Sequence, residues 1–262
     1  MLESFAHMEP ACRSERPDST DWIEEAARRI LEDYDARTPG RIFSQPDFEP
    51  TPDQAYEIQF AVARLRLRRG ETVAGYKIGC VSEAIRRQLG LSRPAFGHVW
   101  SGELHADGME LRLEQFAHLA IEGELAVRIA SEDGRIDAVF PVIELHNHLF
   151  RRTPTSAELI ANNAIHAGVV LPAEFATPGA KPERITVFRN GEALGESASS
   201  AFPGGPGEAV DLVRQHLRSF GLGLRPGQIV LTGTTLPLYP VRSGDRIRVE
   251  YSGGGAVSAG IR

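Results

Sequence analysis

The chain has 262 residues, of which 42% are hydrophobic and 24% charged, and its formal net charge is −6. A chain of this length buries about three quarters of its unfolded surface, so it needs no disulfide or structural metal to hold a core. The acidic balance argues against a nucleic-acid partner and the absence of a ~20-residue apolar run against a membrane span. Cys12 and Cys80 are far apart and form no Cys-x-x-Cys site, so we expect a protein of the reducing cytoplasm.

Helical signals dominate the first 70 residues. Residues 1–19 mix charged, proline and serine residues without periodicity, and we expect a flexible arm there. Apolar residues at helical spacing then predict a helix over about 21–34, which Asp21 can cap, with Glu24 closing a capping box. A second helix is predicted after Thr51, whose side chain can close a capping box with the glutamine three residues later. We therefore expect a helical region over residues 20–70.

Strand signals dominate the rest of the chain. In order, we predict a strand (72–78), a helix (83–89), two strands (119–129 and 138–149), a helix (155–164), a hairpin turning at Asn190-Gly191 (185–197), a helix (209–220) and three strands (228–233, 245–251 and 256–261). Because strands do not alternate regularly with helices, we expect an α+β protein and not a doubly wound sheet.

Three glutamates lie in two of the predicted strands. Side chains alternate along a strand, so Glu122 and Glu124 point to the same face. Glu144 lies in the next strand within an otherwise apolar run, where an unpaired acid is costly. A divalent cation shared by the three carboxylates would remove that cost, since ions such as Mg²⁺ take oxygen ligands. The alternative for the first pair is a solvated strand face.

Two histidines follow the third glutamate. If the strand continues, His146 and His148 share a face with Glu144. A mixed histidine and carboxylate site would favour a softer metal such as Zn²⁺ or Fe²⁺. Surface or hydrogen-bonded histidines are the alternative.

Other candidate polar groups lie at Lys77 and at the end of the strand over 228–233. Lys77 stands between glycines that let a ligand approach closely, and it could neutralise a carboxylate or transfer a proton. A snorkelling surface lysine is the alternative. Thr232 and Gly233 could offer hydroxyl and backbone N–H donors to an anionic ligand.

These segments, in this order, resemble the fumarylacetoacetate hydrolase superfamily, and within it the 2-keto-4-pentenoate hydratase and 4-oxalocrotonate decarboxylase branch. The likeness spans roughly residues 20–262. The motifs that carry it are GYKIG (75–79), LG to PAFG (89–97), IEGELA (121–126), PVIE (141–144), ANNA (161–164), LRPGQIVLTG (224–233) and SGD (243–245).

The resemblance implies a helical N-terminal part and a mixed β-roll domain over residues 71–262, with homo-oligomers usual in the family. It implies Mg²⁺ or Mn²⁺ as the cofactor. The site residues that it implies are Lys77 for catalysis, Glu122, Glu124 and Glu144 for the metal, and Asn163, Thr232 and Gly233 for the substrate.

The function that the resemblance implies is a metal-dependent lyase in aromatic compound catabolism. It would act on a 2-hydroxy-dienoate or its 2-keto tautomer, as a hydratase does, through a metal-stabilised enolate. The alternatives are a 4-oxalocrotonate-type decarboxylase, an acylpyruvate hydrolase on the same scaffold, or a non-catalytic ligand-binding homologue. For a hydrolase, His146, His148 or His98 could activate water.

The chain departs from the branch at polar positions. Ala95 stands where the branch commonly has Asp, and residues 162–165 read Asn-Asn-Ala-Ile where the branch has Asp-Asn-Ala-Ser. The glutamates that the resemblance assigns to the metal and Lys77 are present, so these departures concern the substrate and the reaction.

Overall fold

The computed structural model describes residues 19–38, 40–45, 47–150, 152–175, 184–198, 200–252 and 255–262. The arm expected over residues 1–19 therefore lies outside the described residues, apart from its last position. Within the described ranges, no helix combines the length and the apolar character needed to cross a bilayer.

Helices come first and strands dominate from residue 73 onward. The described elements are α1 (Ser19–Asp35), η1 (Ile42–Ser44), α2 (Pro52–Arg68), β1 (Val73–Gly79), α3 (Glu83–Leu89), β2 (Ala95–Trp100), η2 (Ser101–Glu103), β3 (Leu104–Ala106), β4 (Met109–Leu111), η3 (Leu113–Gln115), β5 (Leu119–Ile129), β6 (Ile136–Asn147), α4 (Ser156–Ala161), η4 (Asn163–Ile165), β7 (His166–Leu171), β8 (Arg184–Arg189), β9 (Glu192–Ala198), α5 (Pro206–Arg218), β10 (Ile229–Leu231), β11 (Tyr239–Pro240), β12 (Arg246–Tyr251) and β13 (Ala256–Ile261).

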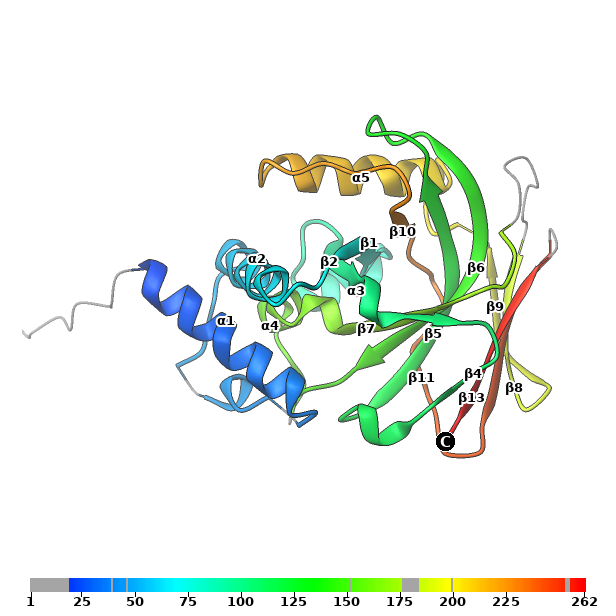
Figure 1. The fold of residues 1–262 in the computed structure, drawn as a ribbon, viewed down its shortest axis with the longest axis horizontal. Helices are drawn as coiled ribbons and strands as arrows, with labels where there is room; N and C mark the ends of the chain where they lie inside the picture. The colour runs from blue at the N-terminus through cyan, green and yellow to red at the C-terminus, as the bar shows by residue number, and fades with distance from the viewer. Residues whose placement is uncertain are drawn as a thin grey trace, which may run out of the picture.

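The strands form two sheets, and the larger one curls (Figure 1). Its order is β2-β1-β10-β5-β6-β7-β3, with β11 also paired to β5, and the smaller sheet has the order β4-β13-β12-β8-β9. In the larger sheet β1 and β10 are parallel, whereas β5 runs antiparallel to both β10 and β6. This mixed sheet with helices confirms the expected α+β class.

The smaller sheet packs on one face of β5 and β6 and decides which way their side chains point. Leu125 lies in the core between the sheets together with Val187 of β8. Gly123 allows the sheets to approach, because a Cβ atom there would lie 2.4 Å from Val187 Cγ2. Since neighbouring residues of a strand point to opposite faces, Glu122 and Glu124 point away from the smaller sheet.

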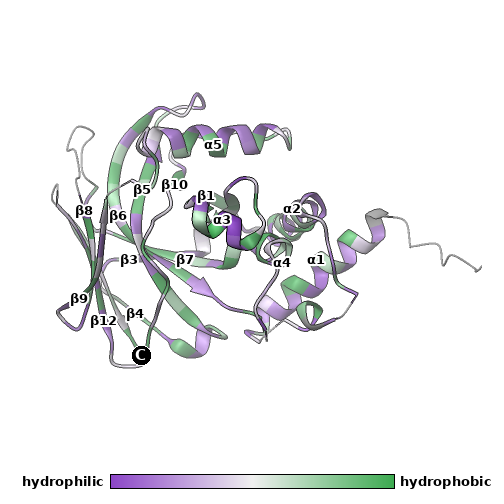
Figure 2. Cartoon of the chain, turned by 180° about the vertical axis from the view of Figure 1, so that it is seen from behind, coloured by the Kyte–Doolittle hydropathy of each residue, from purple (hydrophilic) through white to green (hydrophobic). Residues whose placement is uncertain are grey.

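Helices cover the other side of the larger sheet. One core cluster contains Ile30 of α1, Ile58 of α2 and Val213 of α5 together with Ile78 of β1 and Val230 of β10. Helices α1 and α5 each carry hydrophilic and hydrophobic residues around their surfaces, as expected for helices with one buried side (Figure 2). Because the first two helices share a core with the strands, the boundary at residue 70 between a helical region and a β domain stays a prediction.

Two of the three predicted capping boxes are confirmed. Thr51 and Thr155 each cap a helix with the predicted box. The cap assigned to Asp21 is wrong, because α1 begins at Ser19 and Asp21 lies in its first turn. The hairpin turning at Asn190-Gly191 is confirmed.

Among the strands that were not predicted from the sequence, β2 and β7 are the most buried. Strand β2 is buried at all six positions and β7 at its first five. A strand that is covered on both faces lacks the alternation of polar and apolar residues that identifies a half-buried strand. The helix predicted over 155–164 ends at Ala161, because the next residues leave the right-handed helical conformation.

The buried His216 of α5 makes the folding stability of the protein depend on pH. Its ring stacks on Phe96 at a centroid distance of 4.2 Å, and neither ring nitrogen has a hydrogen-bond partner among the described residues. Burial lowers the pKa of His216 to about 3, whereas an unfolded histidine titrates near 6.5. Between these values the unfolded chain binds a proton that the folded chain does not, so stability falls as the pH decreases from about 6.5 toward 3.

We therefore expect His216→Phe, which keeps an aromatic ring but cannot be protonated, to reduce the loss of stability between pH 7 and pH 5. Urea unfolding of both proteins at the two pH values measures this difference. The wild type and the variant must both be folded at pH 8. An equal loss of unfolding free energy in both proteins would contradict the assignment.

Candidate active site

The three predicted carboxylates lie on one face of the larger sheet. Glu122 of β5 is directly opposite Glu144 of β6 in the antiparallel ladder, and Glu124 follows on the same face of β5. Glu124 and Glu144 are each only 1% exposed, while Glu122 is half-buried. Sequence alternation therefore placed these acids correctly, and the strand pairing brings them together.

Lys77 reaches the same cluster from a strand two places away. It pairs with Leu231 of β10, which in turn pairs with Ala126 of β5. Its Nζ lies 3.3 Å from Glu144 Oε1, and its side chain is 3% exposed. Lys77 is therefore a buried partner of the acids and not a snorkelling surface lysine.

Two histidines complete the cluster. His146 Nε2 lies 3.2 Å from Glu122 Oε2 and 3.3 Å from Glu144 Oε2, because β6 continues through Asn147 and keeps His146 on the face of Glu144. His166, at the start of β7, places Nδ1 2.7 Å from Glu144 Oε1. Sequence reasoning missed His166, although a histidine that opens an apolar run is the same kind of signal as Glu144.

The charged groups strongly shift one another's protonation. Burial and then the carboxylates of Glu144 and Glu122 raise the pKa of Glu124 well above its usual range. Burial alone would raise the pKa of Glu144, but Lys77 and His146 outweigh it and hold that pKa well below its usual range. Burial likewise lowers the pKa of Lys77, yet the surrounding carboxylates outweigh this and raise it. The carboxylates therefore favour the charged form of Lys77, and Lys77 and His146 favour the charged form of Glu144.

The cluster fits a divalent metal ion. Glu122, Glu144 and His146 each offer one ligand atom, and these atoms lie within 4.8 Å of one another. Both oxygens of the buried Glu124 lack a hydrogen-bond partner among the described residues. Three carboxylates and one ammonium carry a formal charge of −2 with neutral histidines, which one dication would neutralise. Buried acids without partners are stabilised by such an ion.

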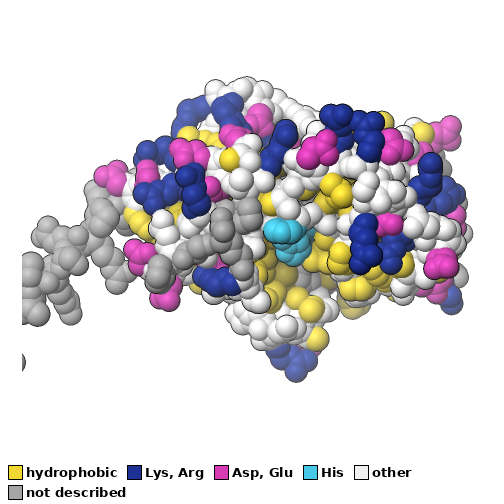
Figure 3. All heavy atoms as spheres, turned by 90° about the horizontal axis from the view of Figure 1, so that it is seen from below, with side chains coloured by type: hydrophobic (Ala, Val, Ile, Leu, Met, Phe, Trp, Pro, Cys, Tyr) yellow, Lys and Arg dark blue, Asp and Glu magenta, His cyan; other side chains and the backbone are white. Residues whose placement is uncertain are grey.

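A pocket of about 510 Å³ opens onto this cluster. Lys77, Glu122 and His146 belong to its lining. Most of the remaining lining is apolar: Ile78, Val81, Ile85, Leu89, Ala95, Pro154, Leu159, Ala164, Ile165, Leu236, Pro237 and Leu238. In the view of Figure 3, histidine atoms lie beside apolar side chains near the middle of the face. A few charged side chains in a mainly apolar lining are typical of a small-molecule site.

The residues predicted to contact a substrate do not all reach this pocket. Gly233 lines it with a φ of +79°, and a Cβ there would lie 2.5 Å from Val81 Cγ1. Thr232 is fully buried, and its hydroxyl donates to the backbone oxygen of Leu125 at 2.9 Å. Thr232 therefore holds β10 against β5, and its contact with a substrate stays a prediction.

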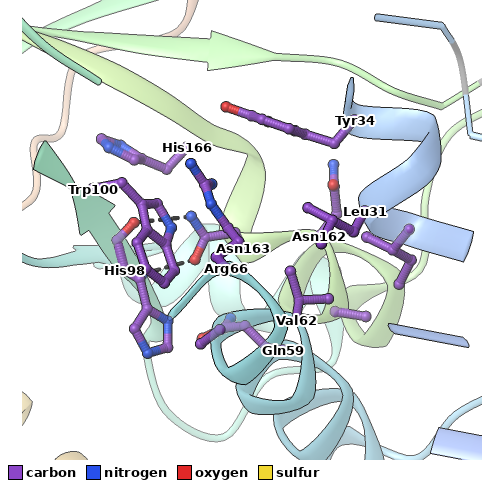
Figure 4. Close-up of a pocket in the computed structure, with 13 residues that line it drawn as sticks. Leu31, Tyr34, Gln59, Val62, Arg66, His98, Trp100, Asn162, Asn163 and His166 are labelled. Atoms are coloured by element: carbon purple, nitrogen blue, oxygen red, sulfur yellow. Dashed lines mark hydrogen bonds between the residues drawn. The ribbon is translucent and has the colours of Figure 1, made fainter. Parts of the chain in front are cut away.

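Asn163 stabilises a strained turn behind the pocket. Its Oδ1 accepts from the backbone N–H of His98 at 2.7 Å, and its Nδ2 donates to the backbone oxygen of the same residue at 2.9 Å (Figure 4). Asn163, Ala164 and Ile165 have φ angles of 54°, 49° and 58°, in the left-handed region that costs non-glycine residues energy. Ala164 and Ile165 line the pocket, so the Asn163 side chain supports the wall, and a direct substrate contact stays a prediction.

Comparison with known proteins identifies the family. The family model of the fumarylacetoacetate (FAA) hydrolase C-terminal domain matches residues 91–262, about two thirds of the chain. The chain belongs to this family, and the expected superfamily is confirmed.

Relatives in sequence are named as hydratases and as 4-oxalocrotonate decarboxylases. The chain is 27% identical over 227 residues to 2-hydroxyhexa-2,4-dienoate hydratase of Comamonas testosteroni, covering 80% of this chain and 86% of that protein. It is 27% identical over 253 residues to 2-oxo-hept-4-ene-1,7-dioate hydratase of Escherichia coli, covering 88% and 95%. The fold matches 4-oxalocrotonate decarboxylase from Pseudomonas putida G7, complexed with magnesium and adipate, with a TM-score of 0.85 at 24% identity, covering 95% and 100%.

The role of Asn163 can be measured through stability. We expect Asn163→Ala to lower the free energy of unfolding by about 2–3 kcal/mol, because two hydrogen bonds to buried backbone groups are lost. Asn163→Gly loses the same bonds but tolerates the positive φ, so its loss should be smaller. Urea unfolding curves of the two variants test this, and wild-type midpoints in both would show that the side chain does not hold the turn.

Proposed function

We propose that this protein is a divalent-metal-dependent lyase that hydrates a 2-hydroxy-dienoate or its 2-keto tautomer, as 2-keto-4-pentenoate hydratases do. The observation that carries the proposal is the buried group of acids and Lys77 at one end of a pocket whose wall is otherwise mainly apolar. The proposal includes Mg²⁺ or Mn²⁺ as cofactor, held by Glu122, Glu124 and Glu144, and a homo-oligomeric enzyme of the cytoplasm.

The residues of the site have separate tasks in this reaction. A bound dication would act as a Lewis acid that stabilises negative charge developing on a substrate oxygen, an effect of several kcal/mol. Lys77 supplies a positive charge and N–H donors at the pocket base, so it can bind the substrate carboxylate or deliver a proton to a carbon atom. The apolar wall excludes bulk water and so strengthens these electrostatic interactions.

The pocket favours a substrate with a single carboxylate. Lys77 is the one lysine or arginine among the described residues that line it. Ala95 and Ile165 also line the pocket, at the two positions where the resemblance expects Asp and Ser. A second carboxylate at the far end of the substrate would be desolvated there without a cationic partner. This supports hydration of a monocarboxylate over decarboxylation of 4-oxalocrotonate, which carries two carboxylates.

A substrate panel tests the proposed reaction. The protein loaded with Mg²⁺ or Mn²⁺ is incubated with 2-hydroxypenta-2,4-dienoate, 4-oxalocrotonate and an acylpyruvate, and the products are identified by NMR. We expect hydration of the first compound, with kcat/KM at least about 10-fold above that for the dicarboxylate. Release of CO₂ from 4-oxalocrotonate or C–C cleavage of the acylpyruvate would favour the decarboxylase or hydrolase alternative. Metal binding without turnover of any compound would favour a ligand-binding homologue.

Replacement of Lys77 separates catalysis from metal binding. We expect Lys77→Met to lower kcat at least about 100-fold, the usual contribution of a positioned proton-transfer group. Metal affinity measured by calorimetry should not fall, because the change removes a positive charge beside the carboxylates. Far-ultraviolet circular dichroism checks that the variant is folded. Wild-type turnover by the folded variant would be evidence against a catalytic Lys77.

A further inference from the structure

His146 lies in the acid cluster at a place from which its ring could bind a metal ion together with the carboxylates. It follows Glu144 by two residues on β6, so both side chains extend from the same face. The pairing of β6 with β7 shifts register between Leu145 and His146, and such bulges commonly redirect a side chain next to a functional site. The His146 side chain is 3% exposed, which excludes water as the ordinary partner of its ring nitrogens.

The contacts of His146 are close but are not hydrogen bonds. Its Nε2 lies 3.2 Å from Glu122 Oε2 and 3.3 Å from Glu144 Oε2. Despite these distances, neither ring nitrogen has a hydrogen-bond partner in the part of the chain that the structure describes. A buried ring nitrogen this close to two carboxylate oxygens is stabilised by a positive charge between them, carried either by a proton on the ring or by a metal ion.

The separations match ligands around one ion. Two ligand atoms bound at right angles to an ion, each about 2.1–2.3 Å from it, lie about 3.0–3.3 Å apart. The distances from His146 Nε2 to the oxygens of Glu122 and Glu144 are 3.2 Å and 3.3 Å, within or at that range.

The two oxygens of Glu144 are divided between different partners. Oε1 lies 2.7 Å from His166 Nδ1 and 3.3 Å from Lys77 Nζ. Oε2 faces His146 at 3.3 Å. Since His166 and Lys77 both act on Oε1, they orient the carboxylate and leave Oε2 directed toward Glu122 and His146, as outer partners of metal ligands do.

We propose that His146 Nε2 binds the metal ion together with one oxygen each of Glu122 and Glu144. The centre is then a mixed nitrogen and oxygen site, and it binds a first-row transition dication such as Mn²⁺ more tightly than Mg²⁺. The reason is that imidazole is a good ligand for these ions, whereas Mg²⁺ prefers oxygen ligands. This inference rests on the metal-dependent function proposed above and specifies its metal. His146 joins the three carboxylates of the proposed function, and the buried Glu124, whose oxygens have no hydrogen-bond partner among the described residues, remains one of them.

The experiment detects the nitrogen directly. Electron spin-echo envelope modulation on the Mn²⁺-loaded full chain should show coupling to a histidine ¹⁴N nucleus. His146→Gln should abolish the coupling, while His148→Gln, a change just after the end of β6 in a residue that lines the pocket outside the ligand cluster, should keep it.

Affinities measured by calorimetry provide a second readout. We expect His146→Gln to weaken Mn²⁺ binding by at least about 10-fold, since an amide oxygen replaces the imidazole nitrogen. Mg²⁺ binding should change much less, so that the preference for Mn²⁺ over Mg²⁺ shrinks. His148→Gln should leave both affinities near those of the wild type.

The outcomes separate this inference from the proposed function. Mn²⁺ binding without ¹⁴N coupling in the wild type, or coupling that persists in His146→Gln and disappears in His166→Gln, overturns the assignment of His146 even if dienoates are hydrated. Coupling that depends on His146 without turnover of any dienoate supports the ligand and refutes the hydratase. A wild-type protein that binds neither Mn²⁺ nor Mg²⁺ overturns both.

Discussion

The site depends on one constraint: the charges buried on one face of the larger sheet must compensate one another. Glu124, Glu144, Lys77 and His146 are almost completely buried on one face of the larger sheet. An isolated ionised group in such a place is strongly unfavourable, and it becomes tolerable only with opposite charges or ligands at close range. The acids hold the lysine in its cationic form, and the lysine and histidines hold Glu144 in its anionic form. Within the described part of the chain, neither oxygen of Glu124 has a hydrogen-bond partner.

The register of β5 against β6 makes this compensation possible. A shift of one residue would turn Glu122 and Glu124 toward the smaller sheet and expose apolar residues on the pocket side. Packing between the sheets opposes that shift, because Gly123 leaves room for Val187 where any larger residue would collide. The apolar core between the sheets is therefore also what directs the acids toward the pocket.

The pocket wall depends on backbone strain held by side-chain hydrogen bonds. Three consecutive non-glycine residues, 163–165, adopt positive φ angles. The two hydrogen bonds of Asn163 to His98 hold this turn against β2. Gly97 permits the contact, since a Cβ there would lie 2.7 Å from the backbone oxygen of Asn163. The family likeness suggested Asn163 as a substrate contact, which stays a prediction, and its hydrogen bonds to His98 give it a supporting role as well.

The amino-acid sequence by itself determined the helices capped by Thr51 and Thr155, the hairpin turning at Asn190-Gly191, the alternation that groups Glu122 with Glu124, and the family. These are local patterns, because each depends on residues a few positions apart or on motifs in a fixed order. Only the tertiary structure decided that Lys77 and His166 meet Glu144, that His146 faces Glu122 across two strands, and that Thr232 and Asn163 bond to backbone beside the pocket. Those contacts join strands distant in sequence. Their distances follow from sheet order, bulges and the space between the sheets, none of which a local pattern encodes.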